Sequence, residues 1–451
     1  MTRADGAEGP RDESIGLARS SALILGSTLV GNAGYFLSVL LLARLLGASG
    51  RGSMAFVVVS ALFLGRVAAL GLGEATTVFV AQRETVRREL LTNAIVFTAL
   101  SGLVVAVAFV ATMALAHGLR PNGVDNAELI ALGAGIVATS IAEGTGGFLR
   151  GLGRFRTLAI VGGVAPWIYL LLLVGFELGR PDLTVTVAAI AWAVHTWVEV
   201  IWGVVASSRA TGFGRVVGSL ARGAIGFGAR AWFGTLAGFL NARADQLLMA
   251  FIASEVALGV YAVAVNASET LLYLPASVGL ALLPRISAIA APERVQTTLL
   301  VFRRLLLVTS AAGVVAAVVG PPLIPRLFGD HFHDSVTPFL LLIPGALGYT
   351  GLTVFTNALA ATAAPGRSSL ASLVTLVTGV TLDLLLIPPF GASGAAFAAT
   401  AAFVTGGATA IVLFRLREPF PLGEMLPRPG DVRALVRLAR DATGRFARRP
   451  A

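Results

Sequence analysis

The sequence predicts an all-α integral membrane protein, because apolar residues dominate it and recur in runs long enough to cross a bilayer. Of its 451 residues, 56% are hydrophobic and 13% are charged, whereas about a quarter of the residues in soluble proteins are charged. A helix rises about 1.5 Å per residue, so about 20 apolar residues span the hydrocarbon core. The pattern predicts about twelve transmembrane helices.

The predicted helices form two sets of six, because the longest connection, 208–229, follows the sixth. Their ranges are 21–42, 54–74, 90–116, 128–149, 157–177, 183–207, 230–252, 256–283, 299–320, 336–361, 368–388 and 393–415. We therefore expect five regions: a cytoplasmic N-terminal tail at 1–20, an N-terminal six-helix lobe at 21–207, a cytoplasmic linker at 208–229, a C-terminal six-helix lobe at 230–416 and a basic amphipathic cytoplasmic tail at 417–451. No loop is long enough to fold as a separate domain.

The basic residues are all arginines, and their positions indicate the membrane topology more directly than they indicate a ligand. Most lie in one set of connections, such as that of Arg83, Arg87 and Arg88, and both termini belong to this set. The positive-inside rule therefore places both termini in the cytoplasm, and the net charge of +10 does not indicate a nucleic-acid partner. Cysteine is absent, which excludes disulfides, thiolate metal sites and cysteine nucleophiles.

The basic C-terminal tail predicts an amphipathic helix on the surface of the membrane. Val432, Leu435, Val436, Ala439 and Phe446 form an apolar stripe that arginines flank. Such a helix lies on an anionic leaflet, so anionic lipids are an expected partner of the tail. A disordered basic tail is the alternative.

Two of the predicted helices carry polar groups on one face. On 230–252 these are Arg230, Gly234, Gly238, Asn241 and Asp245, and on 256–283 they are Asn266, Glu269 and Tyr273. A charge at the centre of an inserted helix costs about 2.5 to 3.5 kcal/mol. We therefore expect these faces to line a cavity that holds water.

Several stretches together resemble one family. They include ARLLGASGRGSMAF after the first helix, GLGEATTVFVAQR at 71–83, LRGLGRFR at 149–156 and RADQLLMAFIASEVALGVYAVA at 243–264. From residue 18 to residue 417, the chain resembles the polysaccharide-biosynthesis branch of the multidrug/oligosaccharidyl-lipid/polysaccharide (MOP) exporter superfamily. The resemblance implies a MATE-like fold of two six-helix lobes around a central cavity, and a lipid-linked oligosaccharide on an undecaprenyl-pyrophosphate carrier as cargo.

Arg66 is the sharpest candidate for cargo binding, because it lies near the middle of the second predicted helix. Its guanidinium matches the oxygens of a pyrophosphate. A structural pair with Glu74 or Glu143 is the alternative. Arg230 and Arg243 are further candidates, together with the polar residues Asn241, Asn266, Glu269 and Tyr273.

The sixth predicted helix places Trp192, His195, Glu199 and Trp202 on one face. The two rings could stack on sugars, but an interfacial tryptophan belt with a hydrogen-bonded histidine is the interpretation that we favour.

Four acids are candidates for coupling to a cation or for a structural role. Asp245 cannot pair with Arg243 on one helix face, so we expect it to bond across to Asn266 or to the first lobe. Glu143, Glu199 and Asp383 are the other three.

No metal or other cofactor is expected. His331 and His333 lie beside Asp330 and Asp334, but the resemblance places a loop there.

The sequence therefore predicts a flippase of the bacterial cytoplasmic membrane that moves a polyprenyl-pyrophosphate-linked glycan by alternating access and is not an enzyme. Glycan polymerases or glycosyltransferases are possible partners. One alternative is a MATE-like antiporter of drugs or metabolites, although the first predicted helix lacks the carboxylate that such proteins often place there. A membrane glycan polymerase or ligase, or a scaffold that recruits glycan enzymes through its tail, are the remaining alternatives.

Overall fold

The computed structural model of the protein describes residues 10–116, 120–121, 123–179, 182–362 and 365–447, and these ranges are helical without a strand. Residues 1–9 and 448–451, which the sequence analysis assigned to the two cytoplasmic tails, lie outside the described residues. The chain divides into two compact units, 1–236 and 237–451. The division falls inside a single helix, α7 (Gly218–Ile252), which begins within the predicted linker.

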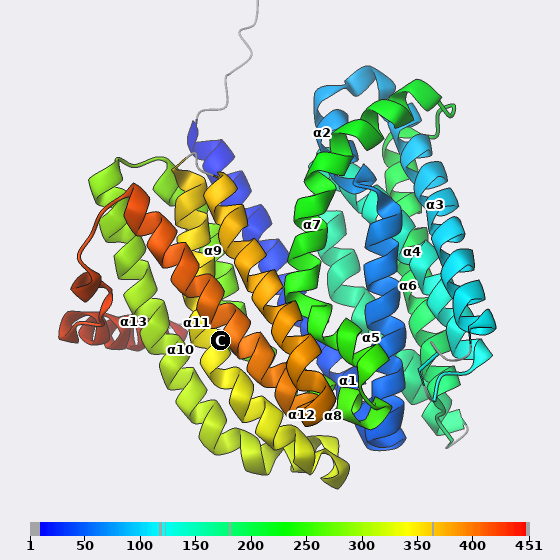
Figure 1. Ribbon diagram of the computed structural model, residues 1–451. Helices are drawn as coiled ribbons and strands as arrows, with labels where there is room; N and C mark the ends of the chain where they lie inside the picture. The colour runs from blue at the N-terminus through cyan, green and yellow to red at the C-terminus, as the bar shows by residue number, and fades with distance from the viewer. Residues whose placement is uncertain (1–9, 117–119, 122, 180–181, 363–364, 448–451) are drawn as a thin grey trace, which may run out of the picture. The chain divides into compact units, whose positions relative to one another are not determined.

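The N-terminal unit holds six complete helices and the first part of α7 (Figure 1). They are α1 (Pro10–Ala69), α2 (Leu72–Gln82), α3 (Arg87–Leu115), α4 (Asn126–Gly151), α5 (Phe155–Gly179) and α6 (Val185–Thr211). A short 3-10 turn, Glu84–Val86, joins α2 to α3.

The C-terminal unit holds the rest of α7 and six further helices. They are α8 (Glu255–Ser268), α9 (Tyr273–Ser287), α10 (Ala291–Phe328), α11 (Val336–Ala361), α12 (Pro365–Arg417) and α13 (Pro429–Ala447). Short 3-10 segments lie at Glu269–Leu271, Asp330–Ser335 and Leu422–Met425.

Eight described helices are long and apolar enough to cross a membrane, or nine if the bent pair of α8 and α9 is one span. Two of them are too long for a single crossing. The candidate span Gly26–Ala69 has 44 residues, which would reach about 66 Å if straight, about twice the hydrocarbon core. It breaks at Gly47, and α12 breaks at Gly391, each glycine having a positive φ. Each break falls between two predicted spans, although the count of twelve and the cytoplasmic termini stay predictions.

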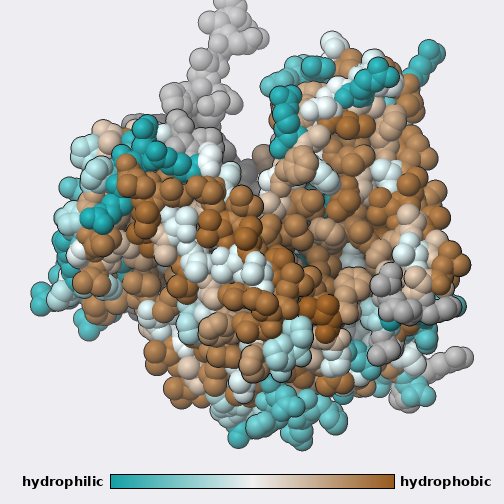
Figure 2. Space-filling view, viewed as in Figure 1, coloured by the Kyte–Doolittle hydropathy of each residue, from teal (hydrophilic) through white to brown (hydrophobic). Residues whose placement is uncertain are grey.

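The described surface has the distribution that a bilayer requires. On the face shown in Figure 2, apolar residues cover the helices along their lengths, and hydrophilic residues gather near the helix ends. Inside the N-terminal unit, Leu72 and Leu91 pack with Phe148 in a buried cluster. In the C-terminal unit, the corresponding cluster includes Phe302, Phe355 and Phe414. Both units therefore have cores of their own.

The eighth predicted helix is not continuous. It is bent by 48° between Glu255–Leu271 and Tyr273–Gly279, with a 3-10 turn at the break. Pro275 lies in the first turn of α9 and has no N–H group to donate back to Leu271, so it cannot extend α8. The prediction that Asn266, Glu269 and Tyr273 share one helix face is therefore wrong.

The C-terminal tail contains the helix α13, and Asp431 fastens this helix to α10. Its carboxylate, which is only 4% exposed, accepts hydrogen bonds from Arg303 Nε at 2.9 Å and from the backbone N–H of Arg428 at 3.0 Å. Arg304 Nε lies 3.8 Å from the other carboxylate oxygen. In Figure 1, α13 runs across α10 rather than along it. Contact of α13 with membrane lipid stays a prediction.

Candidate functional site

Each unit contains a cavity with charged residues in its wall. The N-terminal cavity has a volume of about 350 Å³ and is bounded by α1, α4, α5 and α6. Arg66 on α1 and Glu143 on α4 face each other there, with Nε and Oε1 3.3 Å apart. Their side chains are 29% and 25% exposed, so both remain accessible from the cavity. Both interpretations of Arg66 made from the sequence are therefore compatible with its position: it lines a cavity, and it pairs with Glu143.

Further charged and aromatic groups line the N-terminal cavity. Arg150 comes from the last turn of α4, and Trp192, His195 and Glu199 come from α6. Two arginines and two carboxylates therefore share one small space. Sequence reasoning did not select Arg150, because it lies in the stretch LRGLGRFR and was counted with the loop arginines.

Of the two tryptophans predicted to share one face of α6, Trp202 is exposed, but Trp192 is not part of an interfacial belt. Trp192 is buried, and a Cβ at Gly135 would lie 2.4 Å from its ring, so the indole fills a place that the glycine leaves open. His195 Nδ1 lies 2.5 Å from the carbonyl oxygen of Trp192, and its ring stacks on Tyr169 with centroids 5.1 Å apart. The histidine is thus hydrogen-bonded, as we expected, but the tryptophan packs inside the unit.

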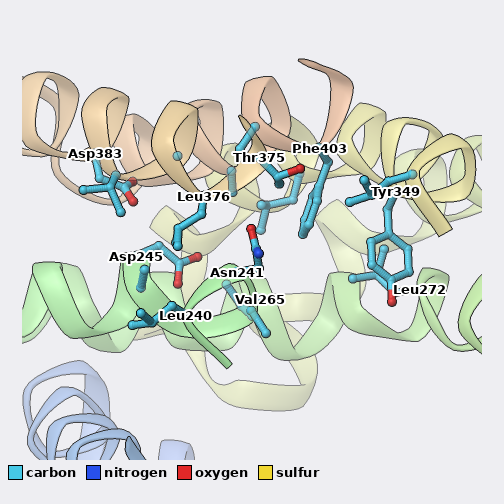
Figure 3. Close-up of a pocket in the computed structure, with 18 of the residues that line it drawn as sticks. Leu240, Asn241, Asp245, Val265, Leu272, Tyr349, Thr375, Leu376, Asp383 and Phe403 are labelled. Atoms are coloured by element: carbon cyan, nitrogen blue, oxygen red, sulfur yellow. The ribbon is translucent and has the colours of Figure 1, made fainter. Parts of the chain in front are cut away.

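The C-terminal cavity, of about 290 Å³, has an acidic character (Figure 3). Asp245 on α7 and Asp383 on α12 both line it. Asp383 is 2% exposed, and its Oδ1 has no hydrogen-bond partner among the described residues. Asn241 donates to the carbonyl oxygen of Ser372 at 3.2 Å, whereas its own Oδ1 is buried and has no partner in the described part of the chain. Three oxygen-bearing side chains thus line one cavity.

The charged residues near this cavity have partners that the sequence did not identify. Asp245 accepts a hydrogen bond from the hydroxyl of Tyr261 and one from the backbone N–H of Gln246 at 2.7 Å. The expected bond to Asn266 is not formed, because Tyr261 on α8 reaches the carboxylate instead. Arg243 forms an ion pair with Glu269. As the spacing predicts, Arg243 and Asp245 do not pair with each other.

Four of the predicted binding residues line neither of these cavities, because Arg243, which pairs with Glu269, is absent from both linings as well. Arg230 is exposed on α7, Tyr273 is exposed at the start of α9, and Asn266 is half-buried on α8. Conversely, Tyr261, Tyr349 and Thr375 line the C-terminal cavity although sequence reasoning did not select them. Tyr261 is a lone polar residue within an apolar run of α8, and that isolation is the signal that could have identified it.

No group of three or more histidine, aspartate or glutamate residues that could hold a metal ion occurs within the described residues. His331 and His333 belong to the 3-10 segment Asp330–Ser335, which leads into α11.

Comparison with known proteins relates the chain to one family. The model of a family described as polysaccharide biosynthesis protein matches residues 17–290. Comparison with curated protein sequences gave no match.

Solved structures share the fold at low sequence identity. An inward-facing MATE multidrug resistance transporter of the MOP superfamily aligns with a TM-score of 0.68 and 14% identity over 88% of this chain and 98% of that chain. The lipid II flippase MurJ in an inward closed conformation aligns with a TM-score of 0.71 and 14% identity over 90% and 89%. A mutant of the Vibrio cholerae MATE transporter VcmN aligns with a TM-score of 0.61 and 13% identity over 89% of this chain and 96% of that chain.

The family model covers more than half of the chain, and the fold agrees with the sequence-based resemblance. The chain therefore belongs to the polysaccharide biosynthesis protein family, and it is a multi-pass membrane protein.

Proposed function

We propose that the protein is a flippase that moves a polyprenyl-pyrophosphate-linked oligosaccharide across the cytoplasmic membrane of a bacterium by alternating access. The observation that supports this most directly is the position of Arg66 and Arg150 in the wall of one cavity within the N-terminal unit. A pyrophosphate carries several negative charges and needs cationic partners in a region of low dielectric constant. The neighbouring polar groups of α6 would then face the sugar.

The Arg66–Glu143 pair suggests how the cavity binds and releases an anion. The separation of 3.3 Å exceeds the 2.7 to 2.9 Å of a strong charge-assisted hydrogen bond. A pyrophosphate could engage the guanidinium in a bidentate manner, and two such bonds would be stronger than the 3.3 Å contact with Glu143. We infer that the pyrophosphate displaces Glu143 from Arg66 on binding, and that Glu143 returns to Arg66 on release.

The C-terminal cavity is our candidate for coupling transport to a cation. Two carboxylates that line one cavity repel when both are ionised, so a proton or a metal cation bound beside them would be stabilised. The buried Oδ1 atoms of Asp383 and Asn241 supply oxygen ligands without other partners in the described chain. A ligand can shift a conformational equilibrium only by its difference in affinity for the two states. Cation binding here would provide such a difference.

The test is reconstitution of the purified protein in vesicles with a fluorescent polyprenyl-pyrophosphate glycan. We expect Arg66→Ala to reduce the transport rate severely and Arg66→Lys to retain part of it, because lysine keeps the charge but not the planar fork. Arg209→Ala is the matched control, since Arg209 is an exposed arginine in the last turn of α6. Normal transport by Arg66→Ala would remove Arg66 from the mechanism.

An antiporter of small molecules is the second candidate, because MATE transporters share the fold. It would be favoured if the vesicles exchanged small organic cations for protons or sodium ions and did not move the glycan lipid. Incorporation of radiolabelled sugar by the purified protein would instead indicate a polymerase or ligase.

A further inference from the structure

A groove at the end of α12 combines an apolar wall with one fixed cation. Its volume is about 580 Å³, and it is lined by residues of the last turns of α12, between 411 and 416, and by the loop at 419–422. Leu416, which is 71% exposed, and Val412 stand on the helix side, and Leu422 stands on the loop side. Arg415 lies between them. This groove belongs to neither of the two charged cavities.

Arg415 is held in place from one side. Its Nε donates to the carbonyl oxygen of Phe420 at 3.1 Å, and Phe420 is itself buried in the core of the C-terminal unit. Within the described part of the chain, this is the one hydrogen bond that the guanidinium makes. A guanidinium has five N–H donors, so those of its Nη atoms remain for a ligand. The cation is therefore oriented before anything binds to it.

The groove lies at the end of a candidate membrane span, where lipid head groups are expected to begin. The candidate span that contains it ends at Arg417, and prolines at 419 and 421 stop the helix soon afterwards. At the end of a membrane span, exposed leucines and valines favour contact with acyl chains, and an arginine favours contact with phosphate groups. The two kinds of wall thus match the two ends of a phospholipid.

The local charge favours an anionic lipid over a zwitterionic one. Of the acids between 415 and 431, Glu418 is paired with Arg294 and Asp431 with Arg303, which leaves Glu424. The same stretch contributes three arginines that are exposed, namely Arg415, Arg417 and Arg428. A lipid with a net negative charge would offset this excess.

We propose that this groove binds one anionic phospholipid of the surrounding membrane, with its phosphate on the guanidinium of Arg415 and an acyl chain along Val412 and Leu416. The lipid is a resident ligand and not the cargo, so the proposal does not depend on what the protein transports.

The experiment is a titration of the full-length purified protein in detergent with phosphatidylglycerol, followed by native mass spectrometry. Phosphatidylcholine with the same acyl chains is the control lipid. We expect Arg415→Gln to weaken phosphatidylglycerol binding about five-fold, which corresponds to about 1 kcal/mol for one arginine near an anionic lipid. Arg417→Gln removes the same charge two residues away, outside the groove lining, and should leave the affinity within a factor of about two.

A second variant guards against an effect on folding. Val412→Trp fills the groove without touching the hydrogen bond to Phe420, and it should also weaken phosphatidylglycerol binding while the thermal midpoint of the protein is retained. Equal losses in Arg415→Gln and Arg417→Gln, or equal binding of the two phospholipids, would overturn the proposal. So would tighter binding of undecaprenyl pyrophosphate than of phosphatidylglycerol with the same dependence on Arg415, since the groove would then be a cargo site.

Discussion

Arg66 on α1 and Glu143 on α4 form an ion pair of 3.3 Å in the wall of a cavity, rather than in a sealed helix contact. If the anion of the cargo competes with Glu143 for Arg66, removing the carboxylate should strengthen anion binding. We expect Glu143→Gln to tighten binding of isoprenyl pyrophosphate about five-fold or more, as the loss of a competing charge worth about 1 kcal/mol would do. Isothermal titration calorimetry measures this.

Glu74→Gln is the matched control for that variant. Glu74 is a half-buried acid of the same unit, and it accepts a hydrogen bond from Thr235 at 2.6 Å without lining the cavity. If Glu143→Gln weakens pyrophosphate binding or leaves it unchanged in a protein that still transports, the pair is structural, and only the exchange mechanism is lost.

The fastening of α13 should depend on pH. Burial alone would raise the pKa of the Asp431 carboxyl, but the N–H group of Arg428 and the guanidinium groups of Arg303 and Arg304 hold the pKa below its usual value. A carboxylate with a lowered pKa stabilises the docked tail above its ordinary pKa of about 4, and that stabilisation is lost as pH falls through the lowered value.

Asp431→Asn should mimic the acidic state at neutral pH. We expect the free energy that holds α13 on α10 to fall by about 2 kcal/mol, because charge-assisted hydrogen bonds are lost. Faster amide hydrogen exchange across 429–437 would report the more frequent detachment. Asp334→Asn, in the loop before α11, is a suitable comparison. Unchanged exchange at neutral pH in Asp431→Asn would show that apolar contacts hold the tail.

Two helices of the N-terminal unit approach so closely that only glycine fits. A Cβ at Gly147 on α4 would lie 2.1 Å from the carbonyl oxygen of Gly73 on α2, where Thr77 also donates to the carbonyl oxygen of Gly147 at 3.1 Å. We expect Gly147→Ala to destabilise the protein by about 1 to 3 kcal/mol through overpacking. Gly175→Ala on α5, where a Cβ meets nothing within 4 Å, should be neutral or stabilising. The thermal unfolding midpoints of both variants in detergent test this difference. Equal midpoints would contradict the close approach of α2 and α4.

The acidic cavity predicts a separable loss of coupling. We expect Asp383→Asn to abolish the dependence of glycan transport on a proton or sodium gradient, while isoprenyl pyrophosphate still binds with the affinity of the wild type. Tyr261→Phe removes the hydrogen bond to Asp245 but leaves both carboxylates, so it should shift the dependence without abolishing it. Gradient-dependent transport that persists in Asp383→Asn would place coupling elsewhere.

Hydropathy alone was sufficient to predict the helical membrane fold, because the length of an apolar run is set by the bilayer and not by its neighbours. Periodicity along one helix also excluded a pair between Arg243 and Asp245. It could not predict the break at 269–272, since the apolar pattern continues across it and a single proline decides where hydrogen bonding fails.

Partners on different helices were harder to predict. Glu143 could be named as a partner for Arg66 because few acids occur within the apolar runs, and scarcity limits the choice. Tyr261 could not be assigned to Asp245 in the same way, because a tyrosine in an apolar run is equally common in a dry core. Sequence reasoning did not select Asp431, because the role of one buried acid among arginines depends on the fold of α10 around it.

The carboxylate of Asp431 also changes how truncations should be designed. A chain that stops before Pro429 loses more than a lipid-facing segment, because it leaves Arg303 and Arg304 without the acid that neutralises them. Poor yield of such a shortened protein would then result from the two arginines that lack an acidic partner. It would not show that the deleted segment recruits other proteins. Stopping after Arg437, or fusing a reporter beyond Ala447, keeps the acid in place and separates the two effects.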